Sequence, residues 1–106
     1  MTTFEESGGV DFLRTSCAVD IHVLPSSTSL EEFYEFFLKS QATSSAVFFV
    51  NLYEIVEMVR QWTTLLPRVK PHYAVKCNDD AVVLTTLMMC GCGFDCSSQS
   101  ELETIL

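Results

Sequence analysis

The chain has 106 residues, of which 48% are hydrophobic and 19% charged, and its formal net charge is −8. This composition is typical of a packed globular protein and argues against a disordered one. The acidic balance disfavours nucleic-acid binding, because phosphate contacts need an excess of Lys and Arg. No apolar run approaches the roughly 18 residues of a membrane-spanning helix. The first residues carry acids where a secretory signal needs bases, so we expect a cytosolic protein that binds no membrane.

The first 45 residues predict a strand and a helix after an irregular start. Residues 1–16 contain two consecutive glycines and are expected to be irregular. Residues 17–24 alternate between apolar and polar side chains, which is typical of a half-buried strand, with His22 on its solvated side. After a turn, Ser29 and Glu32 form a capping box that begins a helix with an apolar face.

From Ala46 onward, short apolar strands alternate with helices. Residues 46–50 are wholly apolar and predict a buried strand. Asn51 is placed to cap a helix whose apolar residues recur at helical spacing as far as Leu66. Trp62 lies beside this stripe and is assigned to core packing. Such alternation predicts βα units and a parallel sheet.

The central stretch of the chain is a short apolar strand that ends on Lys76. Lysine is rarely buried without a partner or a function. From its position alone, Lys76 is either a strand-end lysine that reaches water or a desolvated amine with a lowered pKa, suited to Schiff-base chemistry. Asn78 follows as the cap of a helix predicted to run through Met88.

A second short strand, residues 94–96, carries Asp95 and is followed by a further helix. Parallel strands end at the same edge of a sheet, so the Asp95 carboxylate is expected to approach Lys76. Asp95 can equally be a turn or cap residue. Ser98 and Glu101 predict another capping box. The last helix has no terminal cap before Leu106, which favours a chain that continues further.

Five cysteines stand at positions 17, 77, 90, 92 and 96. Without a secretory signal they are expected to be reduced. The spacing Cys90-x-Cys92-x-x-x-Cys96 lacks the paired C-x-x-C knuckles of structural zinc sites, and no histidine follows it. We therefore expect small buried hydrophobic residues here and no metal site.

Two motifs resemble the ornithine decarboxylase family. They are Pro71-x-Tyr-Ala-Val-Lys-Cys-Asn78 and Gly91-x-Gly-Phe-Asp-Cys-x-Ser-x-x-Glu101. The resemblance runs from about Ala46 to Leu106. Two departures indicate a divergent member: His72 stands where the family usually has phenylalanine or tyrosine, and Cys90-Gly91-Cys92 where it commonly has a small-residue turn with threonine.

The resemblance implies an α/β fold, namely the amino-terminal part of an alanine-racemase-like (β/α)8 barrel. Residues 1–45 would form an amino-terminal strand and helix segment, with the strand belonging to a β-rich domain. Residues 46–106 would form the first βα units of the pyridoxal-phosphate-binding barrel. A whole barrel takes about 250 residues, so this chain cannot close one.

The resemblance also assigns site residues. In the family, the lysine at the position of Lys76 holds pyridoxal 5'-phosphate as an internal aldimine, and the aspartate at the position of Asp95 lies in the active site. Ala74 would leave room for the cofactor ring. Glu101 matches a position near the active site, and its capping role explains it equally well. The implied reaction is decarboxylation of L-ornithine to putrescine, the entry to polyamine synthesis.

Other parts of the implied site come from elsewhere. The family supplies a carboxylate for the pyridine nitrogen and a phosphate cradle from later strands, and it completes the site with a second subunit of a homodimer. The alternative is a truncated, non-catalytic relative that binds antizyme or a family subunit. A third possibility is an incomplete gene product without a stable fold. Lysine, arginine and diaminopimelate stay open as substrates beside ornithine.

Overall fold

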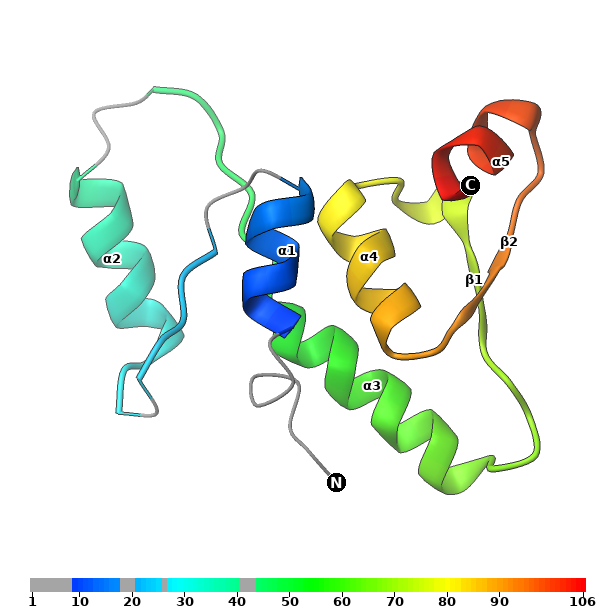
Figure 1. Cartoon of the computed structure of the whole chain (residues 1–106). Coiled ribbons are helices and arrows are strands. Elements are labelled where there is room, and N and C mark those ends of the chain that lie inside the picture. Colours follow the sequence, from blue (N-terminus) through cyan, green and yellow to red (C-terminus); the bar gives the residue numbers. More distant parts are fainter. Residues whose placement is uncertain (1–8, 18–20, 26, 41–43) are drawn as a thin grey trace.

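The computed structural model describes residues 9–17, 21–25, 27–40 and 44–106. In chain order its elements are α1 (Gly9–Cys17), α2 (Leu30–Ser40), α3 (Leu52–Leu65), β1 (His72–Ala74), the short 3₁₀ helix η1 (Val75–Cys77), α4 (Ala81–Met89), β2 (Gly93–Asp95) and α5 (Gln99–Ile105). Figure 1 shows α2 at one end of the molecule and the strands with α5 at the other. None of the helices in these ranges is long and apolar enough to cross a membrane.

The strands and α4 form a parallel βαβ unit. β1 and β2 pair in parallel, with His72 opposite Gly93 and Ala74 opposite Asp95. The crossover between them is α4, which lies beside the strand pair (Figure 1). The predicted α/β class and parallel pairing are therefore confirmed. The sheet of the described residues has two strands, and the barrel stays a prediction.

Helix α4 is apolar on nearly all sides and holds the core. Its Val83, Leu84, Thr86 and Leu87 are buried. The Thr86 hydroxyl donates a 2.7 Å hydrogen bond to the Val82 carbonyl, so this polar group is satisfied inside the core. Val83, Leu87 and Cys92 form one cluster, and the partly buried side chains packed against it are Ile55, Val59, Tyr73 and Phe94. Both α3 and the strand pair are thereby fixed to α4.

The end of α4 explains why Cys92 is buried. Gly91 has a φ of 82°, which glycine adopts without the steric cost of a side chain. The Cys92 N–H donates to the Leu87 carbonyl at 3.1 Å and the Gly91 N–H to the Met88 carbonyl at 2.9 Å. These two bonds form a Schellman motif, in which the residue after the glycine packs back on the helix. Cys92 does so, and its prediction as a buried small hydrophobic residue is confirmed.

Helix α1 covers another side of α4. Leu13 of α1 is 0% exposed. The Cys17 thiol contacts the Thr85 hydroxyl of α4, with 3.6 Å between Sγ and Oγ1. Within α1, Arg14 pairs with Asp11 one turn earlier. The division of the chain at residue 45 stays a prediction, and α1 is in contact with α4 across it.

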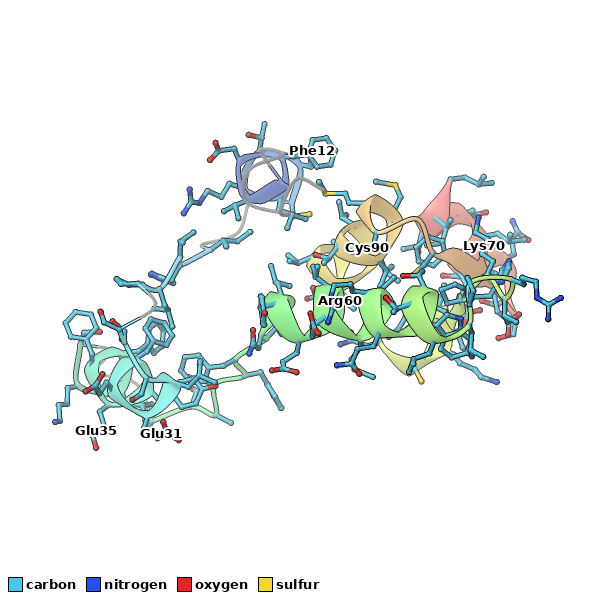
Figure 2. The ribbon with its side chains drawn as sticks, turned by 90° about the horizontal axis from the view of Figure 1, so that it is seen from below. Phe12, Glu31, Glu35, Arg60, Lys70 and Cys90 are labelled. Carbon is cyan, nitrogen blue, oxygen red and sulfur yellow. The ribbon has the colours of Figure 1, made fainter. Side chains whose placement is uncertain are left out.

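Helix α2 packs against an aromatic cluster of its own. The Tyr34 and Phe49 ring centroids lie 4.6 Å apart, and those of His22 and Phe33 5.5 Å. The predicted Ser29–Glu32 capping box is confirmed, because each residue's side chain accepts from the other's backbone N–H. Glu31 and Glu35 project from the opposite side of α2, as Figure 2 shows. This cluster joins the segments before and after α2.

Three sequence predictions for the first 50 residues are wrong. Residues 9–16 are helical and not irregular, while residues 1–8 lie outside the described residues. The strand predicted over residues 17–24 is absent from its described part: Cys17 ends α1, residues 21–24 are not a strand, and residues 18–20 are not described. Residues 46–50 also form no strand. No strand pairs with them in the described chain, and Phe49 packs on α2 instead.

The caps of the later helices follow their sequence signals more closely. Asn51 caps α3 as predicted, since its side chain accepts from the Tyr53 N–H at 3.2 Å. Helix α4 is capped by Asp80 and not by Asn78, because the Asp80 carboxylate accepts from the Val82 and Val83 N–H groups. The assignment of Trp62 to core packing is wrong: its side chain is exposed, and its indole N–H donates to the Val69 carbonyl at 2.7 Å.

Gly93 is required by the ring that lies over it. A Cβ atom at Gly93 would lie 2.3 Å from Cδ2 of His72, the residue opposite it in β1. That separation is far below van der Waals contact, so the ring would have to move.

We expect Gly93→Ala to lower the free energy of unfolding by about 1–3 kcal/mol, the usual cost of overpacking. Urea unfolding of the chain measures this change. The double variant Gly93→Ala/His72→Ala removes the clashing ring and should recover most of the loss relative to His72→Ala alone. Equal losses with and without the His72 ring would contradict the steric cause.

Candidate functional site

Lys76 lies in a tight turn immediately after β1. The strand ends at Ala74, and residues 75–77 form η1, so the prediction that the strand itself ends on Lys76 is wrong by two residues. Val75 is 0% exposed and anchors the turn in the core, whereas Lys76 is exposed. The lysine thus stands at the carboxyl end of a parallel strand, where α/β folds place their sites.

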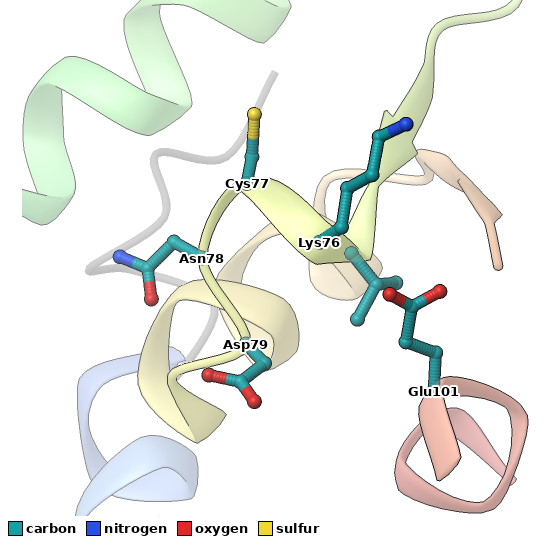
Figure 3. Close-up of a pocket in the computed structure, with 6 residues that line it drawn as sticks. Lys76, Cys77, Asn78, Asp79 and Glu101 are labelled. Carbon is teal, nitrogen blue, oxygen red and sulfur yellow. The ribbon is translucent and has the colours of Figure 1, made fainter. Parts of the chain in front are cut away.

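The turn borders a hollow of about 510 Å³. Its lining residues are Val75, Lys76, Cys77, Asn78, Asp79 and Glu101. In Figure 3, Lys76 and Cys77 extend from η1 to the same side, and Glu101 approaches the turn from α5. The hollow is open to solvent and brings one amine, one thiol and two carboxylates together.

Glu101 is held beside this turn by its own loop. Its carboxylate accepts hydrogen bonds from the Ser97 backbone N–H and from the Ser97 hydroxyl, the latter at 3.0 Å. The Ser98 hydroxyl accepts from the Glu101 N–H at 3.2 Å, so the predicted capping box forms with its return bond shifted to Ser97. The Ser97 N–H lowers the pKa of Glu101 below its ordinary 4.5, and the positive charge of Lys76 acts in the same direction.

Asp95 and Ala74 lie opposite each other in the strand pair. Ala74 is half-buried and Asp95 is exposed. Within the described residues, neither a hydrogen bond nor an ion pair joins Asp95 to Lys76. The structure therefore brings Glu101 to the Lys76 turn and leaves the approach of Asp95 a prediction.

Sequence reasoning did not assign Cys77, Asn78 or Asp79 to this site. They line the hollow because η1 turns the chain back immediately after Lys76. The available signal was the turn-forming run of residues 78–80, which indicates that the chain reverses there.

The cysteine cluster shows no arrangement suited to a metal. In the described ranges, no three His, Cys, Asp or Glu side chains are grouped as metal ligands would be. Burial raises the pKa of the Cys90 and Cys92 thiols, so they stay protonated at neutral pH. All five cysteines are free thiols.

Comparison with known sequences gives a clear family match. Residues 52–106, just over half of the chain, match the family described as pyridoxal-dependent decarboxylase, pyridoxal binding domain. The chain is 50% identical to ornithine decarboxylase 2 of Drosophila melanogaster over 56 residues, which is 53% of this chain and 14% of that protein. It is 50% identical to ornithine decarboxylase of Candida albicans over 60 residues, 56% of this chain and 13% of that protein.

A longer and weaker match covers part of the first half. The chain is 33% identical to ornithine decarboxylase of Mus musculus over 89 residues, which is 81% of this chain and 19% of that protein. The chain thus spans less than a fifth of the length of these curated relatives. No solved structure matches it.

The residues at the hollow fit one end of pyridoxal phosphate. Lys76 is exposed and its amine is not in an ion pair within the described chain, so it is available for the cofactor's carbonyl carbon. The half-buried Ala74 adds little bulk beside the turn. The charged lining other than Lys76 is anionic, namely Asp79 and Glu101, and does not suit the phosphate end.

The lowered pKa of Glu101 predicts a pH dependence of α5. A carboxyl whose pKa is lower in the folded than in the unfolded state stabilises the fold above the unfolded pKa. That contribution is lost as the pH falls through the folded value. We expect NMR titration of the Glu101 carboxyl to give a midpoint below 4.5.

Glu101→Gln should lower the free energy of unfolding at neutral pH, and its difference from wild type should shrink at acidic pH. Glu103→Gln, on the same helix, is the matched control, because within the described residues the Glu103 carboxylate accepts only from the Gln99 side chain. A Glu101 midpoint at or above 4.5 would contradict the hydrogen-bonded geometry.

Proposed function

Since the chain belongs to the pyridoxal-dependent decarboxylases through its match to their pyridoxal-binding domain, we propose that it forms the lysine-bearing part of an enzyme that decarboxylates L-ornithine to putrescine and carbon dioxide. The observation that carries this proposal is the position of Lys76. It is an exposed amine at the carboxyl end of β1, beside a hollow, in a segment similar to ornithine decarboxylases. Putrescine would then enter polyamine synthesis.

Four residues of this chain have roles in the proposal. Pyridoxal phosphate, when bound, supplies an electron sink for the carbon that loses carbon dioxide. Lys76 would hold the cofactor through its side-chain amine, which the amino group of the substrate would displace. Asp95 exchanges protons with the Lys76 amine, and Glu101 keeps a negative charge beside it. Ala74 leaves space above the strand for the cofactor ring.

The remaining parts of the proposal concern the whole protein. We propose that further barrel strands supply the phosphate and pyridine-nitrogen contacts, and that a second subunit completes the site of a homodimer. We also propose antizyme as a protein partner. A cytosolic location stays a prediction, consistent with five free thiols. The mass of the native protein, measured with an antibody to residues 27–40, shows whether a species well above 11.9 kDa carries this sequence.

Covalent attachment of the cofactor tests the assignment of Lys76. After borohydride reduction of the intact protein with pyridoxal phosphate, peptide mapping should find the cofactor on Lys76. Lys76→Ala should abolish attachment, while Lys70→Ala, which removes the lysine just before β1, should leave it unchanged. Attachment to another lysine, or none in the wild-type protein, would overturn the proposal.

Replacement of Asp95 tests its role in proton transfer. We expect Asp95→Asn to lower kcat for ornithine by about a hundredfold or more, because general acid–base groups contribute on that scale. KM should change little. Release of carbon dioxide from L-ornithine measures the rate, with lysine and arginine as competing substrates. Glu103→Gln, which removes an exposed acid of α5 outside the lining of the hollow, is the control. Equal losses in both variants would assign the effect to the loss of one negative charge.

A further inference from the structure

We propose that Tyr73 is a positioning residue for Lys76, because its hydroxyl closes the turn that carries the lysine. The Tyr73 hydroxyl donates a hydrogen bond to the Asn78 carbonyl, with 3.2 Å between the oxygens. The bond joins the strand before η1 to the first residue after it. This hydrogen bond therefore closes a loop around residues 75–77 and links the two ends of the turn. The proposal rests on the assignment of Lys76 as the cofactor lysine.

The ring of Tyr73 is fixed independently of its hydroxyl. It packs against the core cluster of Val83, Leu87 and Cys92. A ring held by α4 and by Cys92, the residue before β2, gives its hydroxyl a defined position, so the bond to Asn78 relates η1 to the core and not merely to β1. The strand and the core thus act on the turn through one side chain.

The far side of the turn is tied to the same helix. The Asn78 side chain accepts from the Asp80 N–H at 2.9 Å. Asp80 in turn caps α4 by accepting from the Val82 N–H at 2.9 Å. Asn78 is thereby linked to the core from two directions, through Tyr73 and through Asp80.

Lys76 depends on this backbone geometry. Its side chain makes neither a hydrogen bond nor an ion pair within the described chain. Since no side-chain partner fixes the amine, the direction of its Cα–Cβ bond sets where the amine can reach. Small misplacements of a reacting group cost large factors in rate, so control of the turn controls the site.

The hydroxyl keeps its proton over the useful pH range. Burial raises the pKa of Tyr73 above its ordinary value of 10. The donor to Asn78 is therefore present at every pH at which a decarboxylase of this kind would work.

Tyr73→Phe in the intact protein isolates the hydroxyl, because the ring and its packing stay. We expect hydrogen exchange at the amides of residues 76–80 to become faster and the apparent affinity for pyridoxal phosphate to fall about fivefold, as for loss of one neutral hydrogen bond. The thermal midpoint of the apoprotein should change little. Tyr53→Phe is the matched control, because Tyr53 is an exposed tyrosine on α3, outside the lining of the hollow.

The two readouts separate the possible results. Unchanged exchange at residues 76–80 would overturn the closed turn. Faster exchange with unchanged cofactor affinity would also overturn the positioning role and leave a purely structural one. If the wild-type protein attaches no cofactor to Lys76, the proposed function fails and the positioning role fails with it, while exchange still decides whether Tyr73 holds the turn.

Discussion

The fold depends on covering α4, a helix that has no fully polar side. α3 contributes Ile55 and Val59 to one side of it, and the strand pair contributes Tyr73 and Phe94. α1 brings the fully buried Leu13 to a further side. Burial of apolar surface is the main favourable term in folding. A helix of this kind is stable in water only when each face is covered, and its covering elements are thereby fixed relative to one another.

The same packing brings the functional groups together. Val75 is fully buried and is followed at once by the exposed Lys76, so the lysine leaves the fold directly after a residue fixed in the core. Glu101 reaches the same place from α5, the helix after β2, because Ser97 holds its carboxylate. The core therefore sets the position of the lysine, and the loop after β2 sets the local charge.

The sequence predicted local features well and partner-dependent features poorly. The caps at Asn51 and at Ser29 with Glu32 are confirmed, because a cap needs only residues two or three positions away. The βαβ unit is confirmed, since its period and its turns are also local. Residues 46–50 have the composition of a buried strand, but a strand needs a neighbour, and Phe49 finds aromatic rings instead. At the site, Lys76 and Glu101 are placed at one hollow. The approach of Asp95 depends on side-chain direction, which spacing does not determine.

The ring of His72 over Gly93 links two positions that lie 21 residues apart. As long as a ring stands at position 72, position 93 cannot gain a side chain without a shift of that ring. The order of change at the two sites therefore matters: replacing the glycine costs stability while the ring is present, and costs less once the ring has been lost or reduced. In a divergent lineage this imposes a direction on the accepted substitutions. Gly93 is thus required by the side chain opposite it in the strand pair, whereas Gly91 is required by its own positive φ.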